Sequence, residues 1–309
     1  MRLATLTWAL AFVLLLALPF RAAAGPDVVA SIAPVHSLVA RVMQGAGAPH
    51  LLLPPGASPH DHAMRPSGAA ALERAALVFW VGPRLERWLT RSLTTLAAGA
   101  RVVRLADTPG LTLLAIREGA LFEAHDHGPA PAPDHGEDGI DPHLWLDPDN
   151  AKLWLGAIAA ALAEADPAQR VLYLANAEAA RAEIDARLAL VRGRPFVVFH
   201  DSFQYFEHRF GIEAAGAVAL GDARAPGPRR LTDIRIRLRA AGGSAGAVPD
   251  AICLFREPQL RSALVDDLVQ GSAVRIGLLD PLGAGLRPGP GLYPELLRGL
   301  ADSLAECLG

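Results

Sequence analysis

Short apolar runs of strand length alternate with amphipathic helical segments along most of the chain, and this alternation constrains the fold most strongly. The predicted strands cover residues 28–32, 51–53, 77–81, 101–105, 196–199, 251–255 and 274–279. Helical patterns lie between them, among them residues 34–44, 83–96, 148–165, 229–241 and 293–307. Strands that alternate with helices form mainly parallel sheets covered by helices on both faces. The sequence therefore predicts an α/β fold.

One long polar segment divides the pattern into two groups. Residues 166–192 begin with Asp166-Pro167, a capping residue followed by proline at the first helical position, and are rich in Ala, Arg and Glu. A single helix of this length would extend about 35 Å at about 1.5 Å per residue. We predict that it is a rigid linker between an N-terminal lobe, residues 25–165, and a C-terminal lobe, residues 193–309.

Residues 1–24 have the pattern of a secretory signal peptide. Arg2 gives a positive start, an apolar run covers residues 10–18, and small residues follow at positions 22–24. The apolar run is shorter than the about 20 residues of a membrane span, so an N-terminal membrane anchor is the less favoured alternative. We expect a periplasmic protein that is cleaved near Ala24. The net charge of −3 and the lack of a basic block argue against nucleic-acid binding.

The chain contains two cysteines, Cys253 and Cys307. An even number of cysteines in an exported protein suggests a disulfide, which here would tie the last helix to the sheet. Metal ligation by the pair is the alternative. We favour the disulfide because neither cysteine lies in a CxxC motif or beside a histidine.

Three histidines and an aspartate have related places in the pattern. His60, His200 and Asp280 each follow an apolar strand, at the end where open parallel sheets place ligand-binding groups. His143 lies between Pro142 and a Leu-Trp-Leu run that must be buried. Three imidazoles and one carboxylate suit tetrahedral zinc, whereas manganese or magnesium would recruit more oxygen ligands. We predict that these four residues converge on one zinc ion in a cleft between the lobes.

Other residues leave alternatives open. A lone histidine is more often structural than a ligand, and His62 is an alternative to His60. Residues 123–139 form a polar segment rich in histidine and acidic residues, for which we expect weak metal capture or, alternatively, no role beyond a solvated loop. Its histidines are His125, His127 and His135.

Several longer motifs surround the predicted ligands. They are Leu-Leu-Pro-Pro-Gly-Ala-Ser-Pro-His-Asp at 52–61, Arg-Pro-Ser at 65–67, Trp-Val-Gly-Pro at 80–83, His-Leu-Trp-Leu at 143–146, Val-Phe-His-Asp at 198–201, Tyr-Phe-Glu at 205–207, Glu-Pro-Gln at 257–259 and Leu-Asp-Pro-Leu-Gly at 279–283. Together these motifs resemble the zinc-binding, ZnuA-type solute-binding proteins of bacterial ABC transporters, over nearly all of the chain after the signal peptide. The resemblance implies two α/β lobes bridged by a rigid long helix, with the metal in the interlobe cleft.

The resemblance also implies roles for individual residues. It assigns metal ligation to His60, His143 and His200, with Asp280 or a water as the fourth ligand. Some zinc-binding members have a glutamate where this chain has Pro59, so that oxygen donor is missing here. Manganese-binding relatives tend to have a carboxylate at the position of His200, and the imidazole therefore argues for zinc. The two cysteines match a disulfide pattern seen in this family.

Function follows from the same resemblance. We expect capture of Zn(II) outside the cytoplasm by a monomer, and delivery to a membrane permease driven by a cytoplasmic ATPase. Ligand histidines would release zinc on acidification, mainly below about pH 6.5. We expect Asp201, Arg65 and Glu257 to support the ligands by hydrogen bonds, with helix capping and surface pairing as alternatives.

Two other functions compete with zinc uptake. The first is a manganese-binding or adhesion-type relative of the same fold. The second is a secreted zinc hydrolase, because three histidines and an open position would suit water activation. The hydrolase is disfavoured because the sequence has no HExxH motif and no carboxylate obviously placed as a general base, and we therefore expect no enzymatic activity.

Overall fold

We describe the chain from a computed structural model, for residues 25–117, 139–184, 194, 196–219, 227–240, 253–260 and 263–309. The predicted signal peptide and the loop histidines His125, His127 and His135 lie outside these residues. Within the described ranges, none of the helices combines the length and apolar character that a bilayer crossing requires.

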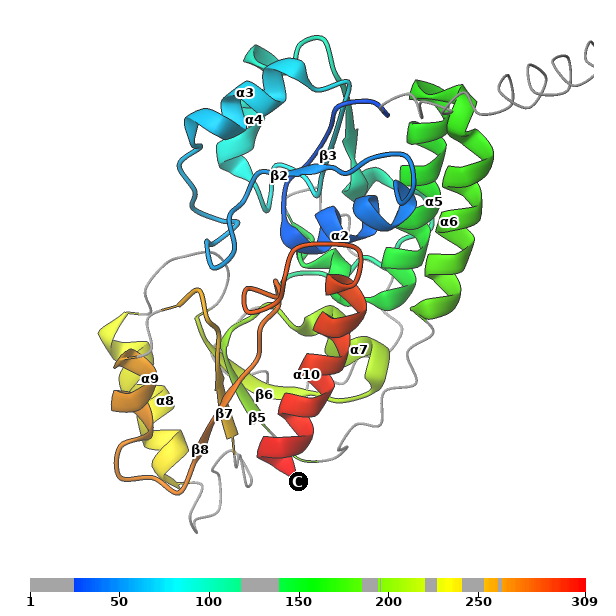
Figure 1. Ribbon diagram of the computed structural model, residues 1–309. Coiled ribbons are helices and arrows are strands. Elements are labelled where there is room, and N and C mark those ends of the chain that lie inside the picture. The colour runs from blue at the N-terminus through cyan, green and yellow to red at the C-terminus, as the bar shows by residue number, and fades with distance from the viewer. Residues whose placement is uncertain are drawn as a thin grey trace, which may run out of the picture.

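The N-terminal lobe contains a parallel sheet with the strand order β2-β1-β3-β4. Its elements are β1 (Val28–Ala30), α2 (Ala33–Val42), β2 (His50–Leu51), α3 (Pro66–Arg74), β3 (Leu77–Trp80), α4 (Arg87–Thr95), β4 (Arg101–Arg104), η2 (Leu105–Asp107) and α5 (Pro148–Ala165). Val28 and Ala30 pack in the cluster that contains α2 and α5, whereas Val29 packs with α3 and α4. Helices cover both faces of the sheet (Figure 1), as the continuous apolar strand sequences predict.

The C-terminal lobe repeats this arrangement with the parallel strand order β6-β5-β7-β8. Its elements are β5 (Phe196–His200), α7 (Gln204–Phe210), β6 (Ala214–Ala219), α8 (Pro228–Ala240), β7 (Cys253–Arg256), α9 (Ala263–Val269), β8 (Arg275–Leu278) and α10 (Leu292–Leu308). Val197 and Phe199 pack with α8 and α9, and Phe196 and Val198 belong to the cluster of α7 and α10. Figure 1 shows these helix pairs on opposite sides of the sheet.

The segment predicted as one long linking helix has a break near its start. Residues Pro167–Gln169 form the 3-10 helix η5, and the α-helix α6 covers Arg170–Glu183 and packs along α5 and α2. A 3-10 turn at a helix start accommodates the missing N–H of Pro167. At about 1.5 Å per residue, the described α-helix α6 is about 21 Å long. Residues 185–192 of the predicted linker lie outside the described part of the chain.

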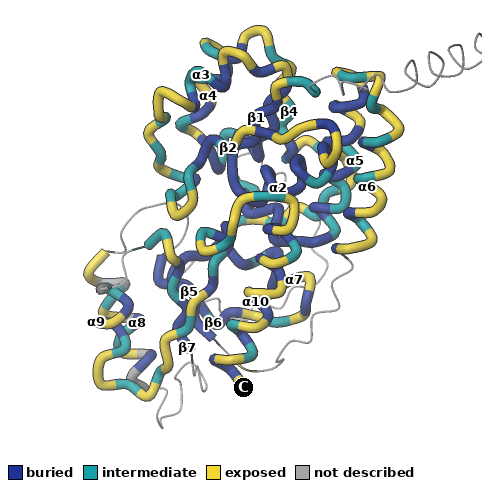
Figure 2. The backbone as a smooth tube through the Cα atoms, viewed as in Figure 1, coloured by how far each residue is buried: buried dark blue, intermediate teal, exposed yellow. Residues whose placement is uncertain are grey.

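The lobes also contact each other directly. One buried apolar cluster extends from β1 and α5 in the first lobe to β5 and α10 in the second (Figure 2). Trp145 belongs to this cluster and lies in the 3-10 helix η4 (Leu144–Leu146). Its indole Nε1 donates to the Pro281 carbonyl at 2.7 Å, and its own carbonyl accepts from the Tyr293 hydroxyl at 2.6 Å. The Leu-Trp-Leu run is buried, as its sequence predicts, and the structure places it between the lobes.

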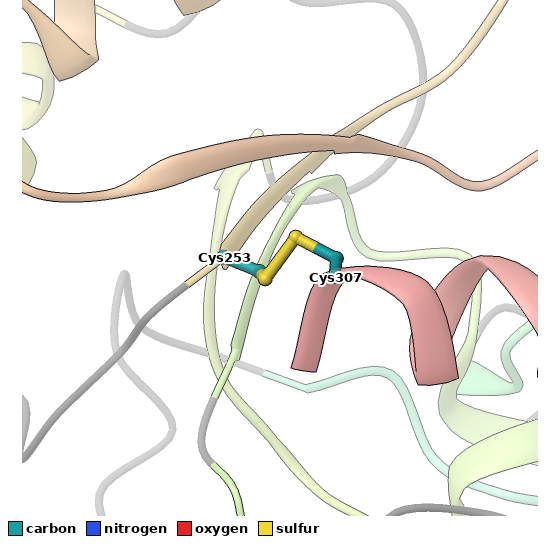
Figure 3. Close-up of a disulfide and its surroundings, with 2 residues drawn as sticks. All are labelled: Cys253 and Cys307. Atoms are coloured by element: carbon teal, nitrogen blue, oxygen red, sulfur yellow. A yellow bond between two sulfur atoms is a disulfide. The ribbon is translucent and has the colours of Figure 1, made fainter. Parts of the chain in front are cut away.

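The predicted disulfide is confirmed. Cys253 at the start of β7 is bonded to Cys307 near the end of α10, with a Cα–Cα distance of 6.2 Å (Figure 3). Cys253 is in register with Phe196, the first residue of β5. The bridge therefore lies at the amino ends of the strands, whereas His200 is at the carboxyl end of β5.

Candidate metal centre

Three of the four predicted ligands lie together. One potential ligand atom from each of His60, His143 and His200 lies within 4.8 Å of the other two. The ring centroids of these residues are separated by 5.3 Å, 5.3 Å and 5.1 Å. His143 and His200 are buried and His60 is half-buried, so the group is open to solvent on the side of His60.

The distance between two of these nitrogens fits a tetrahedral ion. The Nε2 atoms of His60 and His143 are 3.3 Å apart. Two nitrogens bound to one tetrahedral zinc at about 2.0–2.1 Å would be separated by about 3.3–3.4 Å. The imidazoles are therefore spaced for a shared ion without rearrangement of this pair.

The loop that contains His60 is attached to the N-terminal lobe by Trp88. The Trp88 indole Nε1 in α4 donates to the Pro59 carbonyl at 2.8 Å, and the His60 amide donates to Ser58 Oγ at 3.2 Å. His62, the alternative to His60, contacts Trp88 edge to face at a ring-centroid distance of 4.9 Å. It is not part of the three-histidine group.

His143 is oriented by an aspartate two residues earlier. Oδ1 of Asp141 lies 2.7 Å from Nδ1 of His143 and accepts its backbone N–H at 2.9 Å. With Nδ1 donating to this carboxylate, the unprotonated Nε2 faces His60. Burial raises the pKa of the Asp141 carboxyl to about 7, although the His143 amide and the charge of Arg117 lower it. The sequence reasoning did not assign a role to Asp141, although the Asp-x-His spacing is a local signal for this contact.

His200 has a comparable neighbour. Oε1 of the buried Glu257 lies 3.5 Å from Nδ1 of His200 and accepts from Ser202 Oγ at 3.2 Å. Glu257 was expected to support a ligand, and it lies beside His200, but its supporting role stays a prediction. Carboxylates behind ligand imidazoles fix ring orientation and raise basicity.

Asp280 is held by a separate set of donors. Its Oδ1 accepts from Gln259 Nε2 and from the Leu282 amide at 3.1 Å each, and its Oδ2 accepts from the Gly285 amide at 3.3 Å. Asp280 is not part of the group of atoms within 4.8 Å of one another. A ligand role for Asp280 therefore stays a prediction.

Two other predicted supporting residues have different surroundings. Asp201 is buried and forms an ion pair with Arg117. Arg65 is exposed at the start of α3, where its carbonyl accepts from Gly68 and Ala69. Arg65 is the N-cap residue of α3, but its side chain forms no capping hydrogen bond, so its expected supporting role stays a prediction. Arg117 itself was missed, because a single arginine after an apolar run has no distinctive local pattern.

Comparisons with known proteins identify the family of the chain. Residues 28–307 match the sequence family described as zinc-uptake complex component A, periplasmic (ZnuA). A high-affinity zinc uptake system protein ZnuA from Brucella abortus (strain 2308) is 41% identical over 312 residues, which cover 91% of this chain and 91% of the relative.

Solved structures share the fold. A crystal structure of ZnuA superimposes with a TM-score of 0.73 at 23% identity, and covers 92% of this chain and 100% of that one. The solute-binding protein FpvC from Pseudomonas aeruginosa, in complex with Mn²⁺, has a TM-score of 0.73 at 19% identity, with coverage of 92% and 98%. At these identities the structural likeness shows the two-lobed fold and does not distinguish the metal.

Proposed function

The chain belongs to the ZnuA family of periplasmic zinc-uptake components, and from this premise we propose that it captures Zn(II) between its lobes for an ABC importer. The observation that carries the proposal is the group of three imidazoles, in which the facing Nε2 atoms of His60 and His143 have the spacing of a tetrahedral zinc shell. Nitrogen-rich sites suit zinc, whereas manganese prefers more oxygen ligands.

The proposed ligands are His60, His143 and His200, with Asp280 or a water as the fourth. Carboxylates at Asp141 and Glu257 support two of the three imidazoles. A carboxylate beside Nδ1 favours the tautomer that carries its proton on this nitrogen, so that the opposite ring nitrogen is available to bind the ion. Zinc is the cargo of this site. Its release requires that protons displace it from the imidazoles or that other ligands take up the ion.

Calorimetric titration of metal-free protein tests the proposal. Zinc should bind one-to-one and much more tightly than manganese, and His200→Ala should abolish tight binding. The matched control is His208→Ala, because His208 is an exposed histidine on α7 and the variant should bind zinc as the native chain does. Tighter binding of manganese, or unchanged zinc binding in His200→Ala, would contradict the assignment.

Partners and location extend the same proposal. We infer that residues 1–24 are removed on export and that the monomeric, loaded protein docks on a membrane permease driven by a cytoplasmic ATPase. Mass spectrometry of the protein isolated from the periplasm should give a mass that begins near residue 25. Light scattering should give the mass of one chain.

We infer that the protein carries zinc and does not catalyse hydrolysis. Asp141 and Glu257, the carboxylates beside the imidazoles, already contact histidine nitrogens and are poorly placed to activate a bound water. The zinc-loaded protein should show no turnover of peptide or ester substrates. Turnover that disappears on chelation would support the hydrolase instead.

A further inference from the structure

Arg117, a half-buried arginine, lies between two buried acidic residues next to the histidine group. Nη1 of Arg117 is 2.6 Å from Oε2 of Glu207, and Nη2 is 3.1 Å from Oε1. On its other side, Nε donates to both carboxylate oxygens of Asp201 at 3.1 Å, and Nη2 also bonds to Oδ1. The side chains of Asp201 and Glu207 are only 5% and 4% exposed, so these contacts are screened little by water.

The backbone before Arg117 is fixed. Ala115 forms an antiparallel bridge with Ile140, and the Ile116 amide donates to the Gly139 carbonyl at 2.9 Å. Arg117 therefore enters the C-terminal lobe from a defined position in the N-terminal lobe. The pairing is a property of the folded interface and not of a freely moving side chain.

Asp201 connects this ion pair to the proposed metal site. It directly follows His200, and it is a buried carboxylate that remains outside the group of atoms within 4.8 Å of one another. A carboxylate that joined the three imidazoles would add a hard oxygen donor, which favours manganese relative to zinc. A planar guanidinium that engages both oxygens of a carboxylate competes directly with metal ligation.

We propose that Arg117 is a specificity-determining residue, which keeps the metal site selective for zinc by holding the Asp201 carboxylate out of the ligand set. This inference rests on the proposed zinc site. Arg117 acts through Asp201 and does not touch the ion, so it is a positioning residue. Its contribution is measured by the ratio of zinc affinity to manganese affinity, which a merely structural role would leave unchanged.

The experiment compares the zinc and manganese affinities of Arg117→Met with those of the native chain. This substitution roughly keeps the length of the side chain and removes its charge and its guanidinium donors. Manganese affinity should rise and the zinc-to-manganese ratio should fall by about tenfold. The double variant Arg117→Met/Asp201→Ala lacks the competing oxygen and should regain the native ratio. An unchanged ratio in Arg117→Met, or a lowered ratio that persists in the double variant, would overturn the proposal.

The matched control is Arg209→Met. Arg209 also pairs with two carboxylates of the other lobe, Asp147 and Asp149, but neither adjoins a histidine of the group. The ratio of zinc affinity to manganese affinity in Arg209→Met should equal that of the native chain. Should Arg117→Met fail to fold, Arg117→Lys provides the test: a compact ammonium cannot bond both acidic side chains in the same fork, so the ratio should fall partway, and a native ratio would overturn the proposal.

The two proposals fail in different ways. If the native protein does not bind zinc through His200, the zinc site itself is wrong. If the native protein binds zinc tightly and Arg117→Met keeps the native ratio, the zinc site stands and only the role of Arg117 is wrong.

Discussion

The Asp141 carboxylate lies 2.7 Å from Nδ1 of His143, and the same oxygen accepts the His143 amide at 2.9 Å. Because one oxygen contacts both the ring and the backbone of the same residue, it sets both the tautomer and the direction of the imidazole. Both side chains are buried, so water cannot easily replace either contact.

Asp141→Asn should therefore weaken zinc binding. Loss of the charged acceptor lowers the basicity of the imidazole and loosens its orientation, and zinc affinity should fall about 10–100-fold. Competition with a chelator of known affinity measures this change. Asp107→Asn is the control, because Asp107 pairs with Arg104 at an exposed position. Equal affinities in the two variants would contradict the role of Asp141.

Tyr205 supports the backbone around this aspartate. Its hydroxyl donates to the Asp141 carbonyl and accepts from the Leu114 amide, each at 3.0 Å. Tyr205→Phe leaves both groups unpaired, so the protein should be destabilised by about 1–3 kcal/mol and zinc affinity should fall. Tyr173→Phe is the control: the Tyr173 hydroxyl donates to Asp166 beside α6, and its loss should leave zinc affinity unchanged. Chemical unfolding and zinc competition check both variants, and equal zinc affinities would contradict this account.

Glu86 predicts a pH dependence of stability. It is fully buried, and its Oε2 accepts from the Val81 and Gly82 amides at 2.9 Å and 3.2 Å. Burial raises the pKa of Glu86 from 4.5 to about 7, although the hydrogen bonds from the two amides lower it. Between these two values the folded chain binds a proton that the unfolded chain does not. The stabilisation is thus complete below about pH 4.5 and is lost as pH rises to about 7, on the order of 3 kcal/mol.

Glu86→Gln removes this titration and keeps an acceptor for the two amides. The free energy of unfolding of the variant, relative to the native chain, should increase from pH 5 to pH 8. Urea unfolding of metal-free protein at both values measures it. Glu73→Gln, at an exposed position of α3, should show no such change. A difference between Glu86→Gln and the native chain that is independent of pH would contradict the prediction.

The disulfide should stabilise the fold without affecting the metal site. Cys253 and Cys307 are 54 residues apart, and a loop of this size corresponds to about 4 kcal/mol in the chain-entropy model. The bridge lies at the opposite end of the strands from His200, roughly 13 Å away at about 3.3 Å per residue. Replacing both cysteines by alanine should lower unfolding stability by about this amount and leave zinc affinity unchanged. Weaker zinc binding by the folded variant would show that the bridge supports the site.

Much of the fold could be predicted from local sequence, and the exceptions have physical reasons. The apolar strand runs and the helix Pro148–Ala165 stand out because burial on both faces and proline at the helix start leave clear patterns. β6 was missed because Ala214–Ala219 consists of Ala, Gly and Val, with little intrinsic strand preference, and its pairing with β5 decides its structure. The short helix Ala263–Val269 was also not predicted.

The site was predictable in part. His200 at the end of a strand and His143 before an apolar run have informative positions, and the family resemblance selected them from ten histidines. The contacts of Arg117 and Tyr205 were not predictable, because they join residues 64 to 91 positions apart across the two lobes. Such contacts arise only when the lobes pack.

Diffraction at the zinc absorption edge from crystals of one-to-one loaded protein tests the central claim most directly. The account predicts one anomalous peak among His60, His143 and His200, at about 2.0–2.1 Å from one nitrogen of each. The same map would identify Asp280 or a water as the fourth ligand. A zinc peak elsewhere, or a peak that contacts fewer than three of these imidazoles, would contradict the account.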